Sequence, residues 1–573
     1  MRHGLAALAA LLIAAISPSA LSQSVLIEHE YAKKVEAARS VAHLSSSSFG
    51  NQTSESTGQT VFSTFDVDLP GNNKLPVRFG RRLPIGIRYF DQELSGLGSW
   101  DVEVPYIEGT FSKLYGWSVA HANSPNRYKR CSQPSAPMVE GGAFTADDFF
   151  HGYNIHVPGV LDGSLLIDTI AYEDPTDGKT YPWILKSMDR VGCLPSLKNG
   201  HPGEGFVLLT KDGVRYHFDF MVERKASTLD KSGQGKCAGD VTCAALRLQR
   251  TRLFLLASRI EDRFGNHVDY QYDAQGRPLS ITANDGRAIT VQYGSNTVTV
   301  SAHGQVWLYT MQQGYLASVR NPDGSEWKYT PFGMPTQVSG VWNPGPGLLP
   351  SESFNPDDDC LAPRGTGNYW GSVNFEVTHP SGAKGDFEFW GHTFYRSHVM
   401  YTCNIVFTNV EGTSGHALVI TPNYYDVTSL LKLTVSGSGI SPEITGYDYG
   451  VEFYPYCNAI FSANGQPAGP ACNAQGYVED PCVGPYAECT DSIGRWVTTT
   501  RPDGSKVKKR FGVKYGVNEG LLLAEEVLDS TGAVVRRVDY QHLPEAVASQ
   551  QAFGSVVGIP TYTSDPLAAM MRP

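Results

Sequence analysis

Alternation of apolar and polar residues with a period of two, restarted after short glycine turns, is the feature that most constrains this 573-residue sequence. Val268, Tyr270 and Tyr272 are separated by polar residues, and Leu279 and Ile281 repeat the pattern after a turn that contains glycine. Successive side chains of a β-strand point to opposite faces, so each run predicts a strand with one buried face. Adjacent runs of this kind predict antiparallel hairpins. We therefore expect an all-β fold with an extended antiparallel sheet.

A short turn phrase recurs along the chain and supports an internal repeat. In this phrase proline is followed by aspartate or serine and then by glycine, and aromatic residues alternate after it. Proline presets φ and glycine accepts positive φ, so the phrase suits a tight turn. The two clearest copies are Pro322, Asp323 and Gly324, and Pro502, Asp503 and Gly504. Related copies stand at 379–383 and, in a weaker form, at 210–218.

Composition agrees with many short strands. The sequence has 59 Gly and 35 Pro, which form turns, together with 29 Tyr and 25 Phe, which favour strands. Helical periodicity is clear in one place, where apolar residues recur at three- and four-residue spacing between Ile27 and Ala42. We expect a small N-terminal helix there, ended by the serine run 45–48.

The N-terminus predicts export. Arg2 and His3 precede an apolar run that ends at Ser17 and Pro18, and small residues up to Ser22 suit cleavage by a signal peptidase. The run is too short to span a membrane, and no later apolar stretch reaches the ~20 residues that a transmembrane helix needs. We expect residues 1–22 to be a signal peptide and the mature chain to be secreted, periplasmic or on the cell surface.

Ten cysteines suit the same compartment. An even number of cysteines in an exported chain predicts disulfides, and the spacings match neither CxxC motifs nor zinc fingers. A polar segment at 227–244 is expected to be a loop closed by its own pair, and the pairing of the others stays open. The candidates are Cys131, Cys193, Cys237, Cys243, Cys360, Cys403, Cys457, Cys472, Cys482 and Cys489.

The best-patterned part of the chain, residues 253–330, resembles a known family. A segment from Tyr270 is similar to the YD repeat of bacterial Rhs proteins, in which Tyr-Asp is followed by two variable residues and Gly-Arg-Leu. The residues that carry this similarity are Tyr270, Tyr272, Asp273, Gly276 and Arg277, and Pro278 interrupts the last step. The lead-in at 255–266 and the strand and turn at 66–77 are also similar to members of this family.

This resemblance implies a long β-sheet that spirals into a hollow shell, which in many members encloses a C-terminal toxin. The chain has few clean copies of the repeat, and its Asp-Pro pairs lack the glycine of the family's end motif. We expect no separate toxin domain in the residues after Gln541. The chain therefore resembles a shortened or orphan member, and a toxin or effector polypeptide is the partner that the resemblance implies.

These patterns divide the chain into consecutive regions. After the signal peptide we expect a helix and linker (23–48), an N-terminal β region (49–250), YD-type hairpin repeats (251–340), a Cys-rich β region (341–500), further repeat-like hairpins (501–545) and an irregular tail (546–573).

Catalytic and metal-binding patterns are missing or isolated. Neither an HExxH nor a GxSxG motif occurs. His392 and His398 lack an evident third ligand, and the acidic run 357–359 lacks the alternating ligands of a calcium loop. Asp66 and Asp68 alternate on one strand, which predicts an exposed face rather than a catalytic pair. We predict no catalytic residue, no metal site and no cofactor.

Binding is the remaining class of function. The net charge of −11, without a basic stripe, argues against nucleic acid. Trp307, Trp327 and Tyr329 could face a ligand and stack on sugar rings if their side of the sheet is exposed, but alternation favours a buried side. We predict an exported, non-enzymatic β-scaffold that acts by enclosing or binding. The alternatives are a glycan-binding adhesin and a secreted hydrolase.

Overall fold

The computed structural model divides into two compact units, residues 1–48 and 49–573. It describes residues 48–85, 96–135, 137–139, 150, 152–168, 175, 177–185, 187–225, 229–230, 247–330, 373–395, 424–450, 494–513, 518, 520–542 and 556–557. The expected helix at 27–42, the acidic run 357–359 and His398 lie outside these residues. Apart from Ser48, every described residue belongs to the second unit.

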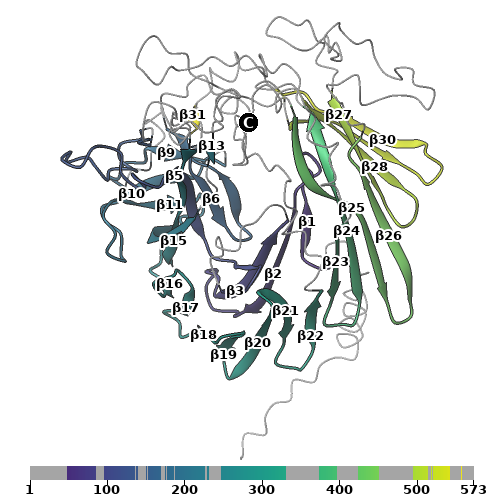
Figure 1. Ribbon diagram of the computed structural model, residues 1–573, viewed down its shortest axis with the longest axis horizontal. Helices are drawn as coiled ribbons and strands as arrows, with labels where there is room; N and C mark the ends of the chain where they lie inside the picture. Colours follow the sequence, from purple (N-terminus) through teal and green to yellow (C-terminus); the bar gives the residue numbers. More distant parts are fainter. Residues whose placement is uncertain are drawn as a thin grey trace, which may run out of the picture. The chain divides into compact units, whose positions relative to one another are not determined.

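One antiparallel sheet, which we call the long sheet, dominates the second unit (Figure 1). From β8 to β30 its strands pair in chain order, except that β13 (Leu229–Asp230) and β14 (Arg247–Leu248) form a separate two-stranded sheet. Its first strands are β8 (Leu166–Ile167), β9 (Trp183–Ile184), β10 (Arg190–Leu194), β11 (Gly205–Leu209), β12 (Arg215–Lys225) and β15 (Arg250–Glu261). β31 (Val556–Val557) pairs with β8.

The long sheet continues as a meander of hairpins. Its strands are β16 (His267–Tyr272), β17 (Pro278–Ala283), β18 (Ala288–Tyr293), β19 (Thr297–Ala302), β20 (Gln305–Gln312), β21 (Tyr315–Arg320), β22 (Glu326–Tyr329), β23 (Val373–Thr378), β24 (Lys384–Tyr395), β25 (Tyr424–Gly437), β26 (Ile440–Asp448), β27 (Gly494–Thr500), β28 (Lys506–Gly512), β29 (Leu522–Leu528) and β30 (Val534–Asp539). No helix occurs among the residues that the structure describes, and the predicted all-β fold with an extended antiparallel sheet is confirmed.

β15 is the point at which the long sheet branches. Along one edge its residues 250–256 pair with β5 (Tyr106–Ser112), whereas residues 259–261 pair with β16. Along its other edge it pairs with β12. β5 carries β6 (Asn154–Val157) and β7 (Leu161–Ser164), and we call these three strands the side arm. Two series of strands therefore diverge from one edge of β15.

A four-stranded sheet, which we call the small sheet, packs against the long sheet. It contains β1 (Asn51–Thr53), β2 (Thr60–Asp68), β3 (Arg78–Pro84) and β4 (Asp101–Val102). The ring of Phe62 lies 5.2 Å from that of Phe375 and 4.8 Å from that of Phe387, measured between centroids. Phe79 lies 5.7 Å from Tyr309 in the same way. These buried rings belong to β2 and β3 on one side and to β20, β23 and β24 on the other, so a core lies between the two sheets.

A bulge changes the expected face of one residue. Leu279 was expected beside Ile281 on the apolar face of its strand, but it is 41% exposed while Ile281 is buried. Gln271 pairs with Ser280 and Tyr272 pairs with Pro278, so the register shifts by one residue at Leu279. The extra residue reverses the alternation and turns Leu279 toward solvent, which corrects the prediction.

Candidate functional site

The YD hairpin between β16 and β17 uses its motif residues for local structure. The Asp273 carboxylate accepts hydrogen bonds from the backbone N–H of Gln275 at 2.9 Å and of Arg277 at 2.8 Å, and from Arg277 Nε at 2.6 Å. Gly276 has φ of +78°, and a Cβ there would lie 2.4 Å from a methyl carbon of Val222. The Asp, Gly and Arg of the motif therefore hold a tight turn against β12.

The tyrosines of this motif are buried beside the branch in the long sheet. Tyr272 donates its hydroxyl to the carbonyl oxygen of Ala257 at 2.7 Å, and the N–H of Ala257 donates to the carbonyl of Pro105 at 2.9 Å. Ala257 stands between the part of β15 that pairs with β5 and the part that pairs with β16. Tyr272 thus satisfies a backbone oxygen that has no ladder partner on that edge. Burial raises the pKa of Tyr270 and of Tyr272, so both hydroxyls stay neutral.

Turns with glycine in the fourth of five positions recur along the sheet. In each, the N–H of the first residue donates to the carbonyl of the fifth, and the glycine N–H donates to the carbonyl of the first. The glycine φ values are positive, as three-residue hairpin loops with a glycine bulge require. Described turns of this kind begin at Thr210, Asp262, Asp273, Ala283, Asn321, His379, Arg501 and Asp529. The repeat phrase identified four of these eight positions, those that begin at Thr210, Asn321, His379 and Arg501.

The Pro-Asp-Gly copies lie in two of these turns. Pro322 and Pro502 occupy the second position, and Gly324 and Gly504 the fourth, with φ of +84° and +81°. Asp323 accepts a hydrogen bond from the N–H of Ser325, and Asp503 accepts one from the N–H of Ser505, both at 2.9 Å. Each aspartate is exposed and has a pKa below its ordinary value, because the following serine donates to its carboxylate. These residues set turns and do not converge on a site.

The aromatic candidates lie on the covered side of the long sheet. Trp307, Trp327 and Tyr329 are buried, as the alternation favoured, and a ligand-facing role would need exposed rings. Trp100, which directly precedes β4, lies 5.0 Å from Tyr329 between ring centroids. Tyr329 and Trp327 also stand beside the guanidinium of Arg81, at 5.1 and 5.4 Å from it. In this structure the aromatic face is occupied by the chain's own β1–β4 region.

A buried ion pair of the small sheet is hydrogen-bonded to two tyrosines of the long sheet. Arg81 donates through Nε to Asp66 at 2.8 Å and through Nη2 at 3.0 Å, and it also bonds the Tyr329 hydroxyl. Tyr309 donates its hydroxyl to the same carboxylate at 2.8 Å. Burial alone would lower the pKa of Arg81, but Asp66 and Tyr329 raise it above its ordinary value, so the guanidinium stays charged.

The expectation that Asp66 and Asp68 share an exposed face is wrong. The Asp66 side chain is buried with Arg81, whereas Asp68 is exposed and pairs with Arg78 at 3.0 Å. The register between β2 and β3 shifts between Phe65 and Val67, so Asp66 is the extra residue of a bulge and turns inward. Adjacent arginines at 81 and 82 in an apolar strand were a sequence signal of a buried partner that the period-two analysis did not use.

A second arginine holds a loop of the small sheet. Arg287 donates through Nη1 to the carbonyl oxygens of Leu69 at 3.0 Å and of Leu75 at 3.1 Å, and through Nη2 to Asn73 at 3.0 Å. Its guanidinium also pairs with Asp285 at 2.9 Å. The loop between β2 and β3 therefore closes around a side chain from the turn that precedes β18. Sequence reasoning missed this contact because its partners are more than 200 residues apart.

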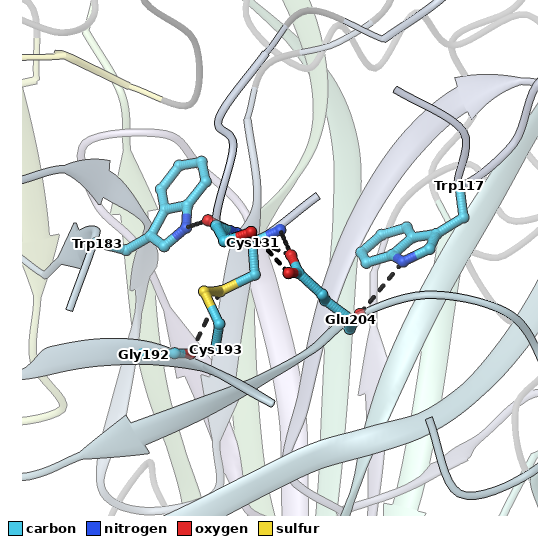
Figure 2. The surroundings of a disulfide bond; sticks show 7 residues. Trp117, Cys131, Trp183, Gly192, Cys193 and Glu204 are labelled. Carbon is cyan, nitrogen blue, oxygen red and sulfur yellow. Dashed lines mark hydrogen bonds between the residues drawn. A yellow bond between two sulfur atoms is a disulfide. The ribbon is translucent and has the colours of Figure 1, made fainter. Parts of the chain in front are cut away.

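A disulfide joins Cys131 to Cys193 and is the pair that the structure describes among the ten candidates (Figure 2). The Glu204 carboxylate accepts hydrogen bonds from the N–H of Cys131 at 3.0 Å and of Ser132 at 2.9 Å. Trp183 donates its indole N–H to the Cys131 carbonyl at 2.9 Å. The crosslink thus fixes residues 131–132 against β10 within a network of hydrogen bonds, of which the one from Trp183 is buried. The other eight cysteines lie outside the described residues.

A pocket of about 390 Å³ lies beside this disulfide. Its volume is in the range of small-molecule sites. Lys179 and Thr180 are exposed at its wall, whereas Tyr181 is buried and donates its hydroxyl to Asp177 at 2.7 Å. Burial raises the pKa of Tyr181 to about 12. The remaining lining residues are Ser132, Pro182, Gly192, Cys193 and Val207.

One cluster has the residue types of a catalytic dyad. Lys198 Nζ lies 2.8 Å from Ser258 Oγ and 4.0 Å from Asp219 Oδ2. Asp219 and Ser258 are the unpaired residues where the β12–β15 register shifts, and burial raises the pKa of Asp219. A lysine beside a serine can activate the serine hydroxyl as a nucleophile. Here Ser258 is buried and in contact with Lys198, which suits a structural contact rather than a catalytic one.

Metal ligands do not gather in the described part of the chain. No group of three histidine, cysteine, aspartate or glutamate side chains there could hold an ion. His392 is buried beside Tyr449, and burial lowers the pKa of His392 to about 4, so its ring is neutral. In the same part of the chain, no helix has the length and apolar character to cross a membrane.

Comparisons with known proteins agree with the motif. The model of the family described as RHS Repeat matches residues 256–288, which include the branch at Ala257 and the YD hairpin. No curated protein matches. The structure of the N-terminal domain of effector protein SpvB from Salmonella typhimurium strain LT2 matches at 10% identity and a TM-score of 0.15, over 68% of this chain and 95% of that one. That TM-score carries no argument about the fold. Residues 256–288 therefore form an Rhs-type repeat, as the sequence resemblance predicted.

Proposed function

We propose that this chain is an exported, non-enzymatic β-scaffold of the Rhs type that acts by enclosing or binding a toxin or effector polypeptide. The observation that carries the proposal is the use of the repeat residues. Tyr272 serves a backbone oxygen at the branch, and Asp273, Gly276 and Arg277 serve a turn. The polar groups of the repeat are used for hydrogen bonds within its own strands and turn. This use supports a role in building a surface rather than in catalysing a reaction.

Protection from protease tests the enclosing role. The chain is co-expressed with the polypeptide encoded next to it, and the mixture is treated with protease under native conditions. We expect the neighbouring polypeptide to survive in the presence of the chain and to be degraded when expressed alone. Equal degradation in both samples would contradict enclosure.

A substrate panel tests the non-enzymatic part of the proposal. The purified full chain is assayed against esters, peptides and glycosides, together with Ser258→Ala, which removes the hydroxyl that Lys198 contacts. We expect no conversion by either protein. Conversion by the wild type that is lost in Ser258→Ala would replace the scaffold proposal with a hydrolase.

Export is supported by the N-terminal pattern and by the disulfide between Cys131 and Cys193, because such bonds persist in oxidising compartments. Mass spectrometry of the chain from its natural host tests this point. We expect the mature protein to start near Gln23 and residues 131 and 193 to resist alkylation until reduction. A chain that retains residues 1–22 and carries free thiols at both positions would contradict export.

Glycan binding has one observation in its favour, the pocket beside the disulfide. Lys179 and Thr180 offer polar groups at its wall, whereas the aromatic residues of β20 and β22 are buried. A glycan array with the wild type and Lys179→Ala tests it. Binding that the substitution weakens would support an adhesin role at this pocket, and unchanged binding would exclude the pocket.

A further inference from the structure

A histidine lies between two carboxylates where the small sheet meets the side arm. His156 Nε2 is 2.7 Å from Glu103 Oε2, and its Nδ1 is 2.5 Å from Asp162 Oδ1. Both ring nitrogens face acceptors, so the arrangement fits an imidazolium that donates two charge-assisted hydrogen bonds. The side chains of His156 and Glu103 are buried, whereas that of Asp162 is 69% exposed.

This cluster connects strands of different sheets. Ser63 of β2 donates its hydroxyl to Glu103 Oε1 at 2.6 Å, and Glu103 directly follows β4. His156 belongs to β6 and Asp162 to β7 of the side arm. The ring of Tyr106, on β5, lies 5.0 Å from that of His156. The chain of contacts from Ser63 to Asp162 therefore spans the junction of the small sheet with the side arm.

The charge balance of the junction depends on the histidine. Arg82 donates to the Tyr106 hydroxyl at 3.0 Å and interacts with Glu103, Asp162 and Asp101. Arg252 pairs with Glu108, and both interact with Tyr106. A protonated His156 and Arg82 both act on Glu103, and a neutral ring removes the closer of these two positive charges. Loss of one proton thus leaves the buried Glu103 without its closest positive partner.

We propose that His156 is a proton-controlled latch that holds the small sheet to the side arm when the ring is charged and weakens that junction when the ring loses its proton. The latch is distinct from the enclosing role, but it would control how firmly the small sheet is held beside the side arm. Protonation is the only input that the mechanism needs.

The direction of the effect follows from linkage. Burial works to lower the pKa of His156, but the hydrogen bonds with Asp162 and Glu103 outweigh it and raise that pKa above 6.5. A group whose pKa is raised by folding stabilises the fold below its unfolded pKa, and this stabilisation is lost as pH rises through the folded pKa. Burial would raise the pKa of Glu103, but its hydrogen bond with His156 lowers it below 4.5. Glu103 therefore becomes protonated, and loses its charge, only in stronger acid. The latch is closed between these limits and opens on the alkaline side.

Hydrogen exchange of the full chain, corrected for the intrinsic rate at each pH, tests the latch. Protection of residues 60–68 and 101–104 is compared at about pH 6 and about pH 8.5 in the wild type and His156→Gln. We expect wild-type protection to fall with rising pH, by about tenfold for each unit by which folding raises the pKa of His156. In His156→Gln the same segments should be less protected at the lower pH and lose the pH dependence.

A matched control uses His217, which lies 3.2 Å from Glu261 between β12 and β15 and is more exposed. His217→Gln should leave the pH dependence of residues 60–68 unchanged. A fall in His156→Gln that is equal at both pH values would overturn the proposal and leave a purely structural contact.

If His156→Gln does not fold, Asp162→Asn serves instead, because its side chain is largely exposed. Asparagine keeps an acceptor oxygen but removes the negative charge beside the ring, which should lower the pH at which protection of residues 60–68 is lost. A transition that stays at the wild-type pH would equally overturn the latch.

Discussion

Two parts of the long sheet have the same turns but different burial. The turns that begin at Asn321 and at Asp529 share one hydrogen-bond pattern, with Gly324 and Gly532 at positive φ. In the first part, β22 to β24 place alternate residues in the core against the small sheet. In the second part, β30 is exposed at nearly every position. Turn chemistry is therefore sufficient to form hairpins and insufficient to bury them.

What separates the two parts is the small sheet. Phe49 and Phe62 both pack on Phe387, and all three rings are buried. The described contacts between the β1–β2 turn and β28 are polar. An example is the ion pair between Glu55 and Lys509 at 2.6 Å. Apolar burial supplies most of the stability of a domain, so we expect the free energy of unfolding to be concentrated where the small sheet lies.

The largest expected effect is that of Arg81→Leu. The substitution leaves the buried carboxylate of Asp66 without its guanidinium, and breaking a buried pair from one side costs about 3–5 kcal/mol. We expect the free energy of unfolding in denaturant to fall by this amount, with loss of the small sheet from the long sheet.

Arg537→Leu is the matched control. Arg537 also bonds a carboxylate, Asp539, and pairs with Glu526, but it lies on the exposed β30. Exposed pairs contribute little because water screens them, so its unfolding curve should match that of the wild type. Equal losses in the two variants would mean that β30 is as buried in solution as β3.

A second comparison uses two glycines from the same type of turn. Gly324→Ala meets open space and should cost only the strain of positive φ, about 1–2 kcal/mol. Gly276→Ala adds a Cβ 2.4 Å from Val222, so overpacking should add about 1–3 kcal/mol to the same strain. Denaturant midpoints of both variants, measured side by side, test the difference. Identical losses would show that the YD turn does not rest on β12.

Sequence reasoning predicted what is local in this fold and missed what is distant. The alternation at Val268, Tyr270 and Tyr272 predicts buried positions, because side-chain direction along a strand has a fixed period. Bulges break that rule: one extra residue in each strand placed the side chains of Leu279 and Asp66 on the face opposite to the predicted one. The packing of residues 49–104 on β20 to β24 has no local signal, since its contacts join segments more than 200 residues apart.

The candidate site shows the same limit. Tyr272, Asp273, Gly276 and Arg277 were predicted as motif residues from a short phrase, and the family match covers them. The roles of Ala257, Arg287 and His156 depend on partners that come together only through pairing of β15 with two different strands or through the small sheet. Periodicity cannot give these partners, because it describes one strand at a time.

The smallest expected effect is that of Val535→Ala in β30. Val535 is 68% exposed, so removing its methyl groups should change the free energy of unfolding by less than about 0.5 kcal/mol. Val377→Ala removes the same atoms from a fully buried position on β23 and should cost about 2 kcal/mol. Similar losses would show that another surface covers Val535 in solution. Burial of β30 would then come from a source other than the small sheet, and the contrast between the two parts of the long sheet would fail.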